Sequence, residues 1–180
     1  MMSLSINFLS GGGERMKIFI SGSISKEIEK EKTTEVELGY KDKFKLAELY
    51  LESKGHQVMN PTVLPYGFSH EDYMNICYEM IKACDMVVFL RGNEDSIGSK
   101  MERDFANENK IKTCTLDQMI VYHAISQLED LREEKLGDVK AVLRNKDIDP
   151  KEVYIHDFLS LDWALNDLKK RYLLTDNGGA

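Results

Sequence analysis

Short apolar runs alternate with longer amphipathic stretches over the first part of the chain. The apolar runs are rich in Val, Ile, Phe and Met, which is typical of buried β-strands, and we predict four strands at residues 17–22, 57–59, 85–90 and 111–115. The stretches between them carry apolar side chains at helical spacing and predict helices at residues 41–54, 71–83 and 99–109. Strands that alternate with helices are typical of a parallel sheet. We therefore predict an α/β, Rossmann-like (flavodoxin-like) domain over residues 16–115, with the sheet sandwiched by helices.

After the fourth predicted strand the pattern becomes helical. We predict one helix over residues 117–135 and a second that begins at Asp149-Pro150 and runs to about Leu173, because Pro is favoured at the first helical position. Residues 116–180 would then form a helical C-terminal extension. The apolar residues that could form a buried stripe on its second helix are Phe158, Leu161, Trp163 and Leu165.

Two polar segments stand outside this pattern. Residues 11–15, GGGER, directly precede Met16, and all three residue types can be written with purine-only codons, as in a translated ribosome-binding site. We interpret residues 1–15 as a disordered or non-native extension before a native start at Met16, the alternative being a genuine N-terminal arm. Residues 25–37 are too charged to pack and long for a connection, so we interpret them as a candidate flap over a site.

Composition narrows the classes of partner. The 180 residues include 24 Lys and Arg against 31 Asp and Glu, a formal net charge of −7. Affinity for nucleic acid comes from basic groups that displace counterions, so we expect no nucleic-acid partner. We also expect a cytoplasmic chain without membrane contact, because no run approaches the roughly 20 apolar residues that span a bilayer and no signal peptide is indicated. Free thiols, rather than a disulfide or a metal site, are expected from the spacing of Cys77, Cys84 and Cys114.

In parallel α/β sheets, ligands bind at the carboxyl ends of the strands, so the site is expected in the loops that follow Ile20, Met59 and Leu90. The first loop begins with a turn of small residues, Ser21-Gly22-Ser23, which suits the close approach of a phosphate or a ribose. It lacks the glycines of a dinucleotide fingerprint, and a purely structural turn is the alternative. Asn60 ends the second strand at the same edge and is a candidate sugar or base contact.

The loop after the third predicted strand carries the strongest constellation. Asp95, Ser96, Gly98 and Ser99 lead into a predicted helix whose first turn would hold Glu102. Backbone N–H groups and the helix dipole at that end favour an anion and would keep Glu102 ionised. An ionised, positioned carboxylate is what nucleophilic attack at a sugar anomeric carbon requires. The alternative is that Asp95, Ser96 and Glu102 only cap the helix.

Five segments resemble, in order and spacing, the nucleoside 2-deoxyribosyltransferase-like superfamily, and above all its bacterial and phage branch of unknown function. The segments are residues 16–23, 49–61, 72–74, 84–88 and 96–102. The superfamily also contains the 2′-deoxynucleoside 5′-monophosphate N-glycosidases. The resemblance implies cleavage or transfer of the N-glycosidic bond of a (deoxy)nucleoside 5′-monophosphate or nucleoside, with no cofactor and no metal. It also implies a homo-oligomer, for which the C-terminal helices are natural contacts.

By this resemblance, Glu102 matches the family nucleophile. It would attack C1′, release the base and leave a glycosyl ester that water or a second base resolves with retention. Six residues earlier, the transferases that act on free nucleosides commonly carry a carboxylate, whereas the monophosphate glycosidases carry a serine that helps to hold the 5′-phosphate. The residue here is Ser96, so we favour a nucleotide substrate.

Two positions depart from the family pattern. The family's carboxylic acid, which protonates or grips the leaving base, lies eight residues before Asp85, where this chain has Cys77. Phe19 stands where the transferases often have a tyrosine that touches the nucleophile. Either another acid replaces the missing one, or the domain is a catalytically weakened nucleotide-binding or sensing domain of phage or bacterial origin. The candidate acids are Asp72, Glu79 and Asp95.

The remaining candidates come from the residues alone. Tyr73 and Met74 are candidates for an apolar wall against a base, and His70 is a candidate for the pocket lining. The other histidines are interpreted as structural or surface residues, and they are His56, His123 and His156. A third possibility is an interaction protein whose function lies in residues 116–180.

Overall fold

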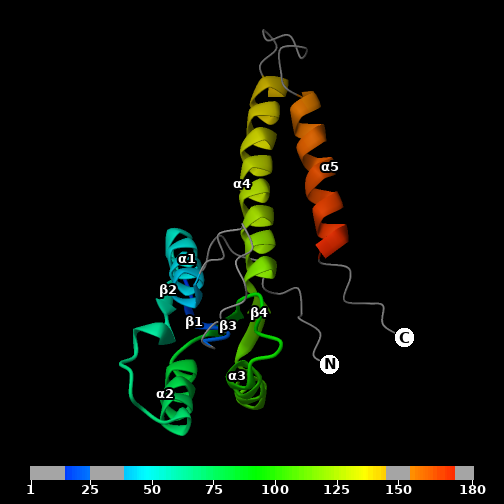
Figure 1. Ribbon diagram of the computed structural model, residues 1–180. Helices are drawn as coiled ribbons and strands as arrows, with labels where there is room; N and C mark the ends of the chain where they lie inside the picture. Colours follow the sequence, from blue (N-terminus) through cyan, green and yellow to red (C-terminus); the bar gives the residue numbers. More distant parts are fainter. Residues whose placement is uncertain (1–14, 25–38, 145–154, 173–180) are drawn as a thin grey trace, which may run out of the picture. The chain divides into compact units, whose positions relative to one another are not determined.

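A computed structural model of the protein describes residues 15–24, 39–144 and 155–172 (Figure 1). The chain divides into two compact units between Met119 and Ile120, and each is described by itself. The predicted extension at residues 1–15, apart from Arg15, and the candidate flap at residues 25–37 lie outside the described residues.

The first unit is built on a four-stranded parallel sheet with the strand order β2-β1-β3-β4. This confirms the predicted α/β fold, and the order is that of the first four strands of flavodoxin-like folds. The strands are β1 (Lys17–Ser21), β2 (Gln57–Met59), β3 (Met86–Phe89) and β4 (Lys112–Thr115). Phe19 pairs with Met59 on one side and with Val87 on the other, so β1 is hydrogen-bonded on both edges and its apolar residues are fully buried.

This strand order decides where a ligand can bind. From β1 the chain passes to the neighbour on one side, β2, and then crosses to the other side to form β3. The connections that leave the carboxyl ends of β1 and β3 therefore diverge to opposite sides and open a crevice between them, which is the topological switch point at which α/β sheets bind ligands. Ser21 and Phe89, which are paired in the register, mark this end of the two strands.

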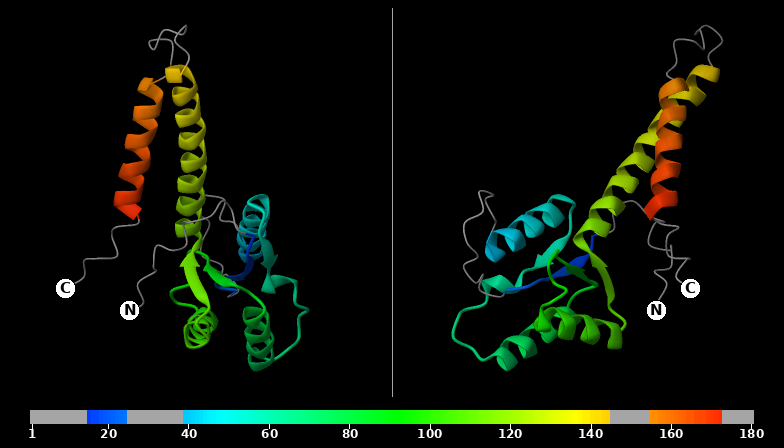
Figure 2. Two further views of the ribbon diagram at one scale, coloured as in Figure 1. Left: turned by 180° about the vertical axis from the view of Figure 1, so that it is seen from behind. Right: turned by 45° about the vertical axis from the view of Figure 1, so that its right-hand side comes forward.

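Helices cover the sheet on both faces, with α2 and α3 on one face and α1 on the other (Figures 1 and 2). Their bounds are α1 (Tyr40–Ser53), α2 (His70–Lys82) and α3 (Ile97–Glu108). A short 3-10 helix, η2 (Pro61–Val63), follows β2. The rings of Tyr78 on α2 and Phe105 on α3 stack with their centroids 4.3 Å apart, which ties these two helices together beneath the sheet.

The start of α3 differs from the prediction in a way that matters for the site. The predicted helix begins at residue 99, but α3 begins at Ile97, because the Ser96 hydroxyl accepts a hydrogen bond from the backbone N–H of Ser99 at 3.2 Å and caps the helix there. Glu102 consequently lies in the second turn of α3. The expectation of a carboxylate in the first turn is therefore wrong.

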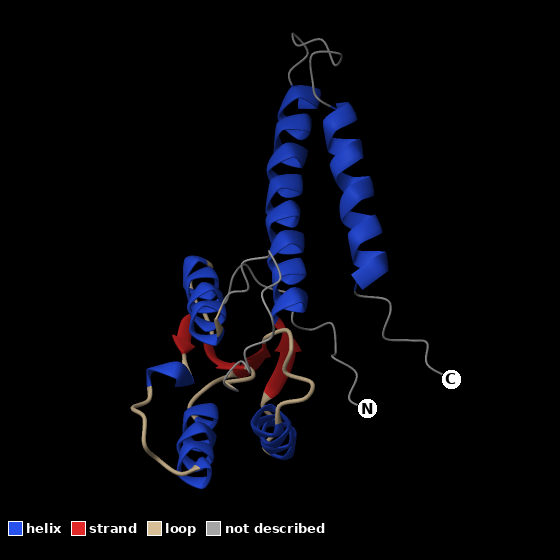
Figure 3. Ribbon diagram, in the orientation of Figure 1, coloured by secondary structure: helices blue, strands red, loops and turns tan. Residues whose placement is uncertain are grey.

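The described residues of the second unit are helical, as predicted for the C-terminal part (Figure 3). Helix α4 (Leu116–Arg144), which begins in the first unit, runs further than the predicted end at residue 135, and α5 (Ile155–Tyr172) follows it. Two ion pairs join the helices, Arg132 with Asp162 at 2.6 Å and Glu129 with Lys169 at 2.5 Å. The predicted cap at Asp149-Pro150 lies outside the described residues.

The predicted buried stripe on α5 is only partly correct. Leu165 is 3% exposed and Leu161 is half-buried, but Trp163 is 70% exposed. Leu161 and Leu165 are one helical turn apart, whereas Trp163 lies between them and is turned to another side of the helix. The side chains of Phe158 and His156 are outside the described part. Within the described residues, no helix has the length and apolar character that crossing a bilayer would require.

Candidate active site

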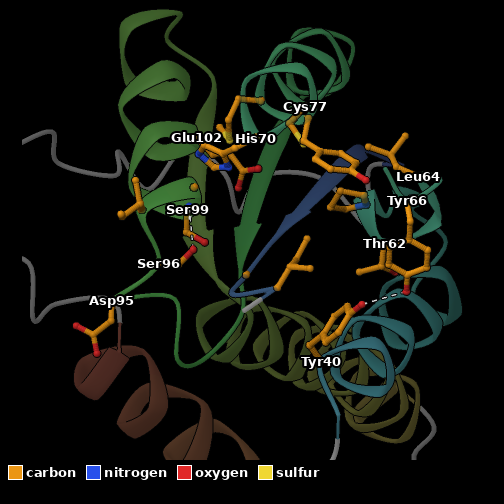
Figure 4. Close-up of a pocket in the computed structure, with 17 residues that line it drawn as sticks. Tyr40, Thr62, Leu64, Tyr66, His70, Cys77, Asp95, Ser96, Ser99 and Glu102 are labelled. Atoms are coloured by element: carbon orange, nitrogen blue, oxygen red, sulfur yellow. Dashed lines mark hydrogen bonds between the residues drawn. The ribbon is translucent and has the colours of Figure 1, made fainter. Parts of the chain in front are cut away.

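A cavity of about 480 Å³ opens at the carboxyl ends of β1 and β3, at the sheet edge that the strand order selects (Figure 4). Its wall combines the connection after β1, the first residue of α1, the segment after β2, one face of α2, and the start of α3 with the loop before it. The lining residues are Gly22, Ile24, Tyr40, Pro61, Thr62, Leu64, Tyr66, His70, Tyr73, Met74, Cys77, Asp95, Ser96, Ile97, Gly98, Ser99 and Glu102.

Glu102 supplies a buried carboxylate to this wall. Its side chain projects from the second turn of α3, and the residue is only 7% exposed. The hydroxyl of Ser21, at the end of β1, donates a hydrogen bond of 2.5 Å to Oε2 of Glu102. The thiol of Cys77, on the facing helix α2, donates a second hydrogen bond to the same carboxylate. Three elements that are far apart in the sequence thus converge on one acidic group.

Burial dominates the electrostatics of Glu102. It raises the pKa of the carboxyl to about 7, although the hydrogen bonds from Ser21 and Cys77 act to lower it. The expectation that the helix terminus keeps Glu102 ionised is therefore wrong, because burial affects its pKa more strongly than the stabilising groups do. The dipole effect fades after the first turn, whereas both hydrogen-bond donors are neutral and compensate only part of the desolvation. A carboxyl with a pKa near 7 exists in both forms at physiological pH.

Cys77 stays a thiol beside this carboxylate. Burial and the neighbouring negative charge of Glu102 raise its pKa to about 12. A protonated thiol can donate a hydrogen bond, and that is what Cys77 does here. At the position where the resemblance implies a carboxylic acid, this chain therefore holds a neutral group that orients Glu102.

Ser99 contributes a second unusual group. Its side-chain oxygen is buried and has no hydrogen-bond partner, and the residue is 1% exposed. A buried hydroxyl left unpaired costs about 1–3 kcal/mol, so such groups usually have a partner. Because Ser99 lines the cavity at the start of α3, a ligand can supply that partner. Ser96, one turn earlier, uses its hydroxyl as the helix cap and also lines the wall.

The residues at the end of β1 and in the turn after it have different roles. Ser21 faces Glu102 and is fully buried, while Gly22 lines the cavity. A Cβ on Gly22 would lie 3.0 Å from the ring of Phe44, so a side chain here would require that ring to shift. Ser23 is half-buried and is not among the lining residues.

Asn60 is placed differently from the sequence prediction. It is buried outside the cavity wall, where its Oδ1 accepts hydrogen bonds from the backbone N–H and the hydroxyl of Thr62, at 3.0 and 2.7 Å. Its amide nitrogen donates to Glu48 at 3.0 Å. Asn60 therefore caps η2, and Thr62 is the residue of this segment that reaches the cavity.

The candidate acids on α2 are also placed away from the cavity. Asp72 forms a capping box with Ser69, whose hydroxyl and backbone N–H hold the pKa of this exposed carboxyl below its usual range. Glu79 is exposed and pairs with Lys82 at 2.6 Å. Neither lines the cavity. Asp95 does line it, at the exposed outer end of the loop before α3 and apart from Glu102 in Figure 4.

An aromatic wall completes the site, and two of its members were not predicted. The hydroxyls of Tyr40 and Tyr66 are 3.3 Å apart, and the Lys41 ammonium lies 4.8 Å from the centre of the Tyr66 ring. Tyr73, which was predicted, donates its hydroxyl to the carbonyl of Pro65 at 2.8 Å. Tyr40 directly precedes the helix predicted at residues 41–54, and Tyr66 lies in the Pro-containing loop at the edge of the sheet where a ligand is expected. Aromatic residues at these two places are the feature of the sequence that could have indicated them.

The described residues hold no group of three or more His, Cys, Asp or Glu side chains arranged to bind a metal ion. The chemistry available at the wall is that of one buried carboxyl group, neighbouring hydroxyls, a thiol, an imidazole and aromatic rings. This set suits the binding of a small polar molecule with a planar part.

The comparisons with known proteins give one match. No curated protein and no solved structure matches the chain. The family model described as a domain of unknown function (DUF4406) matches residues 16–115, which include all four strands, helices α1 to α3 and every residue of the cavity wall. The match covers more than half of the 180 residues. The chain therefore belongs to the DUF4406 family.

Proposed function

We propose that the protein cleaves the N-glycosidic bond of a (deoxy)nucleoside 5′-monophosphate, or transfers its sugar, with Glu102 as the nucleophile. One observation carries this proposal. The carboxyl group of Glu102 is buried in the wall of a cavity at the switch point of the sheet, held by hydrogen bonds from Ser21 and Cys77. The resemblance of residues 16–115 to the nucleoside 2-deoxyribosyltransferase-like superfamily supports it further.

The reaction would proceed in two displacements at C1′. A carboxylate oxygen of Glu102 forms a bond to C1′ while the bond between C1′ and the base nitrogen breaks, and the electron pair of that bond leaves with the base, which takes up a proton. Water, or a second base, then attacks C1′ and releases Glu102 as a carboxylate. Two inversions give net retention. Because the hydrogen bonds hold the carboxylate in one orientation, little freedom is lost in the first step.

Different parts of the cavity wall offer groups that suit the phosphate and the base of a nucleotide. The unpaired hydroxyl of Ser99 lies at the N-terminus of α3, where backbone N–H groups and the helix dipole favour an anion such as a phosphate. The aromatic side chains of Tyr40, Tyr66 and Tyr73 offer flat apolar surface to a base. Glu102 lies on the same wall and would face the sugar between them.

A second candidate function is a nucleotide-binding or sensing domain without catalysis. The observation that favours it is Cys77, which stands where the nucleoside 2-deoxyribosyltransferase-like superfamily has a carboxylic acid. Its pKa of about 12 makes it a poor proton donor. In that case the cavity would bind the same ligands and leave the glycosidic bond intact.

One experiment separates the two functions. The protein is incubated with a panel of ribo- and deoxynucleosides and their 5′-monophosphates, free base is measured by chromatography, and thermal shift is recorded in parallel. We expect base release from the parent chain and none from Glu102→Gln. The matched control is Glu108→Gln, an exposed glutamate on the same helix, which should release base at the parent rate. Thermal shifts without base release would support the sensing domain and contradict the enzyme.

A further inference from the structure

This inference rests on the proposed function and concerns the proton that the leaving base needs. When the bond to C1′ breaks, the base leaves with an extra electron pair, and a general acid that protonates it speeds the step by about 10²–10⁴-fold. One side chain of the cavity wall that can donate a proton, His70, has no part in the roles assigned so far to Glu102, Ser21 and Cys77. We propose that His70 is the general acid that protonates the leaving base.

The placement of His70 supports this role. It is the first residue of α2 and lines the cavity. Its imidazole reaches across to α3, because a Cβ on Gly98 would lie 4.0 Å from its Cε1. Gly98 precedes Glu102 by one helical turn, so both occupy the same face of α3. Figure 4 shows the imidazole and the Glu102 carboxylate in the same part of the wall.

The facing helix extends this arrangement. Met74 lies one turn after His70 on α2, and its sulfur would be 3.7 Å from a Cβ on Gly98. Cys77 follows along the same face and contacts Glu102. One face of α2 therefore presents the imidazole at one end and the thiol that orients the nucleophile at the other. Tyr73, one of the aromatic side chains that would face the base, lies three residues after His70 on α2, so His70 borders the base side of the cavity as well as the start of α3.

The other proton donors of the wall are less suitable. The Cys77 thiol has a pKa of about 12 and already donates to Glu102. The Tyr73 hydroxyl is engaged with Pro65, and the Tyr40 hydroxyl with that of Tyr66. The imidazole of His70, in contrast, has ring nitrogens that can donate a proton to a base in contact with them.

The test compares two leaving groups in the full-length chain. The first substrate is 2′-deoxyguanosine 5′-monophosphate, whose base needs a proton to leave. The second is its N7-methyl derivative, whose base already carries a positive charge and leaves neutral. For His70→Gln we expect base release from the first substrate to fall by about 10²-fold or more, and release from the second to stay within about threefold of the parent chain. Glu71→Gln, next to it on α2, is the control and should change neither rate.

Each other outcome has a distinct meaning. An equal loss on both substrates, in a variant whose circular dichroism and melting temperature match the parent chain, would show a binding role and overturn the proposal. Unchanged rates on both would overturn it as well. His70→Asn, tested in the same way, repeats the comparison if the glutamine variant does not fold. Failure of the proposed function looks different, because the parent chain would then release base from neither substrate, or Glu102→Gln would release it from both.

Discussion

At the scale of single residues, the site depends on the balance of two effects at Glu102. Burial disfavours the carboxylate and raises its pKa to about 7, while two neutral donors stabilise the charged form. Burial is the larger effect, since a hydroxyl and a thiol replace only part of the hydration that the carboxylate loses. The result is a group that is partly ionised at neutral pH and can take part in reactions there.

Removing the Ser21 hydroxyl should move this balance. In Ser21→Ala, Glu102 loses the donor that most strongly lowers its pKa, so the pKa should rise further above 7. Base release would then reach its plateau at a higher pH than in the parent chain. The shift can be measured from the pH profile of kcat/KM or from the carboxyl ¹³C chemical shift of Glu102. Ser53→Ala, at an exposed serine of α1, is the control, and an unchanged profile in Ser21→Ala would contradict the role of this hydrogen bond.

The raised pKa also predicts how stability depends on pH. Because the folded-state pKa of about 7 lies above the ordinary value of 4.5, the native carboxyl stays protonated between these values while the unfolded one ionises. The stability linked to Glu102 is therefore full below pH 4.5 and is lost as the pH rises through 7. Glu102→Gln imitates the protonated form, so it should gain about 1–3 kcal/mol over the parent chain at pH 8 and almost nothing at pH 4.

Urea unfolding at the two pH values measures this difference, with Glu108→Gln as the control. A gain that is the same at pH 4 and pH 8 would mean that the substitution acts through packing and not through the charge. A stability gain on replacement of Glu102 is expected where a buried side chain is held charged at the expense of folding.

At the scale of elements, the start of α3 is both a capped helix end and part of the cavity wall. The Ser96 hydroxyl caps the helix by accepting from the Ser99 N–H, and the Ser99 hydroxyl has no hydrogen-bond partner at the cavity wall. Helix α2 closes the opposite side, starting from its own capping box at Ser69. Two helix N-termini therefore border one cavity, and both carry polar groups at its edge.

Substitutions at Ser96 should separate these functions. Asp is as good an N-cap as Ser, so Ser96→Asp should keep the stability of the parent chain, whereas Ser96→Ala should lose about 1 kcal/mol. The added carboxylate would repel a phosphate at this helix end. We therefore expect Ser96→Asp to lower the ratio of monophosphate to nucleoside cleavage by about tenfold or more, which corresponds to roughly 1.4 kcal/mol.

Base release from paired substrates, together with urea unfolding, provides both readouts. Ser96→Ala serves as the matched variant, since it removes the cap without adding charge. An unchanged substrate ratio in Ser96→Asp would place the phosphate elsewhere.

At the scale of the whole molecule, three free cysteines report on the opening of the sheet unit. Burial raises the pKa of Cys77 to about 12, that of Cys84 to about 11 and that of Cys114 to about 12. The thiolate is the reactive form, and very little of it exists at neutral pH in the folded chain. Rapid modification of these residues therefore requires the unit to open.

Alkylation followed by mass spectrometry tests this. We expect modification by iodoacetamide at pH 7.5 to be at least about 10²-fold slower than for a free thiol of ordinary pKa, and to accelerate on addition of urea. A bound nucleoside monophosphate should slow the reaction of Cys77 more than that of Cys84, because only Cys77 lines the cavity. Equal protection of both residues would indicate a global effect of the ligand on stability.

The alternation of strands and helices could be predicted because it depends on local properties. Apolar runs and helical spacing are properties of neighbouring residues, and they placed β1 to β4 and the helices between them within a few residues. The order of the loops along the chain also placed Ser21, Ser96 and Glu102 at one sheet edge, because parallel strands end on the same side. The resemblance to a known superfamily singles out Glu102 among these polar residues as the expected nucleophile, and this role stays a prediction.

What required the tertiary structure was the environment of each side chain. Whether Asn60 meets a ligand depends on Thr62 and Glu48, which occupy its amide group, and whether Trp163 is buried depends on which side of α5 packs. The pKa of Glu102 depends on α2, which covers it and supplies Cys77 from a distant part of the chain.

The sequence by itself determined the elements, their parallel arrangement and the edge that carries the polar loops, since these follow from periodicity and chain order. Only the tertiary structure decided which of those polar groups share one cavity, which are occupied by structural hydrogen bonds, and that His70 lies opposite the first turn of α3. The physical reason is that burial and pairing are determined by neighbours in space, and the neighbours in this cavity come from five separate segments of the chain.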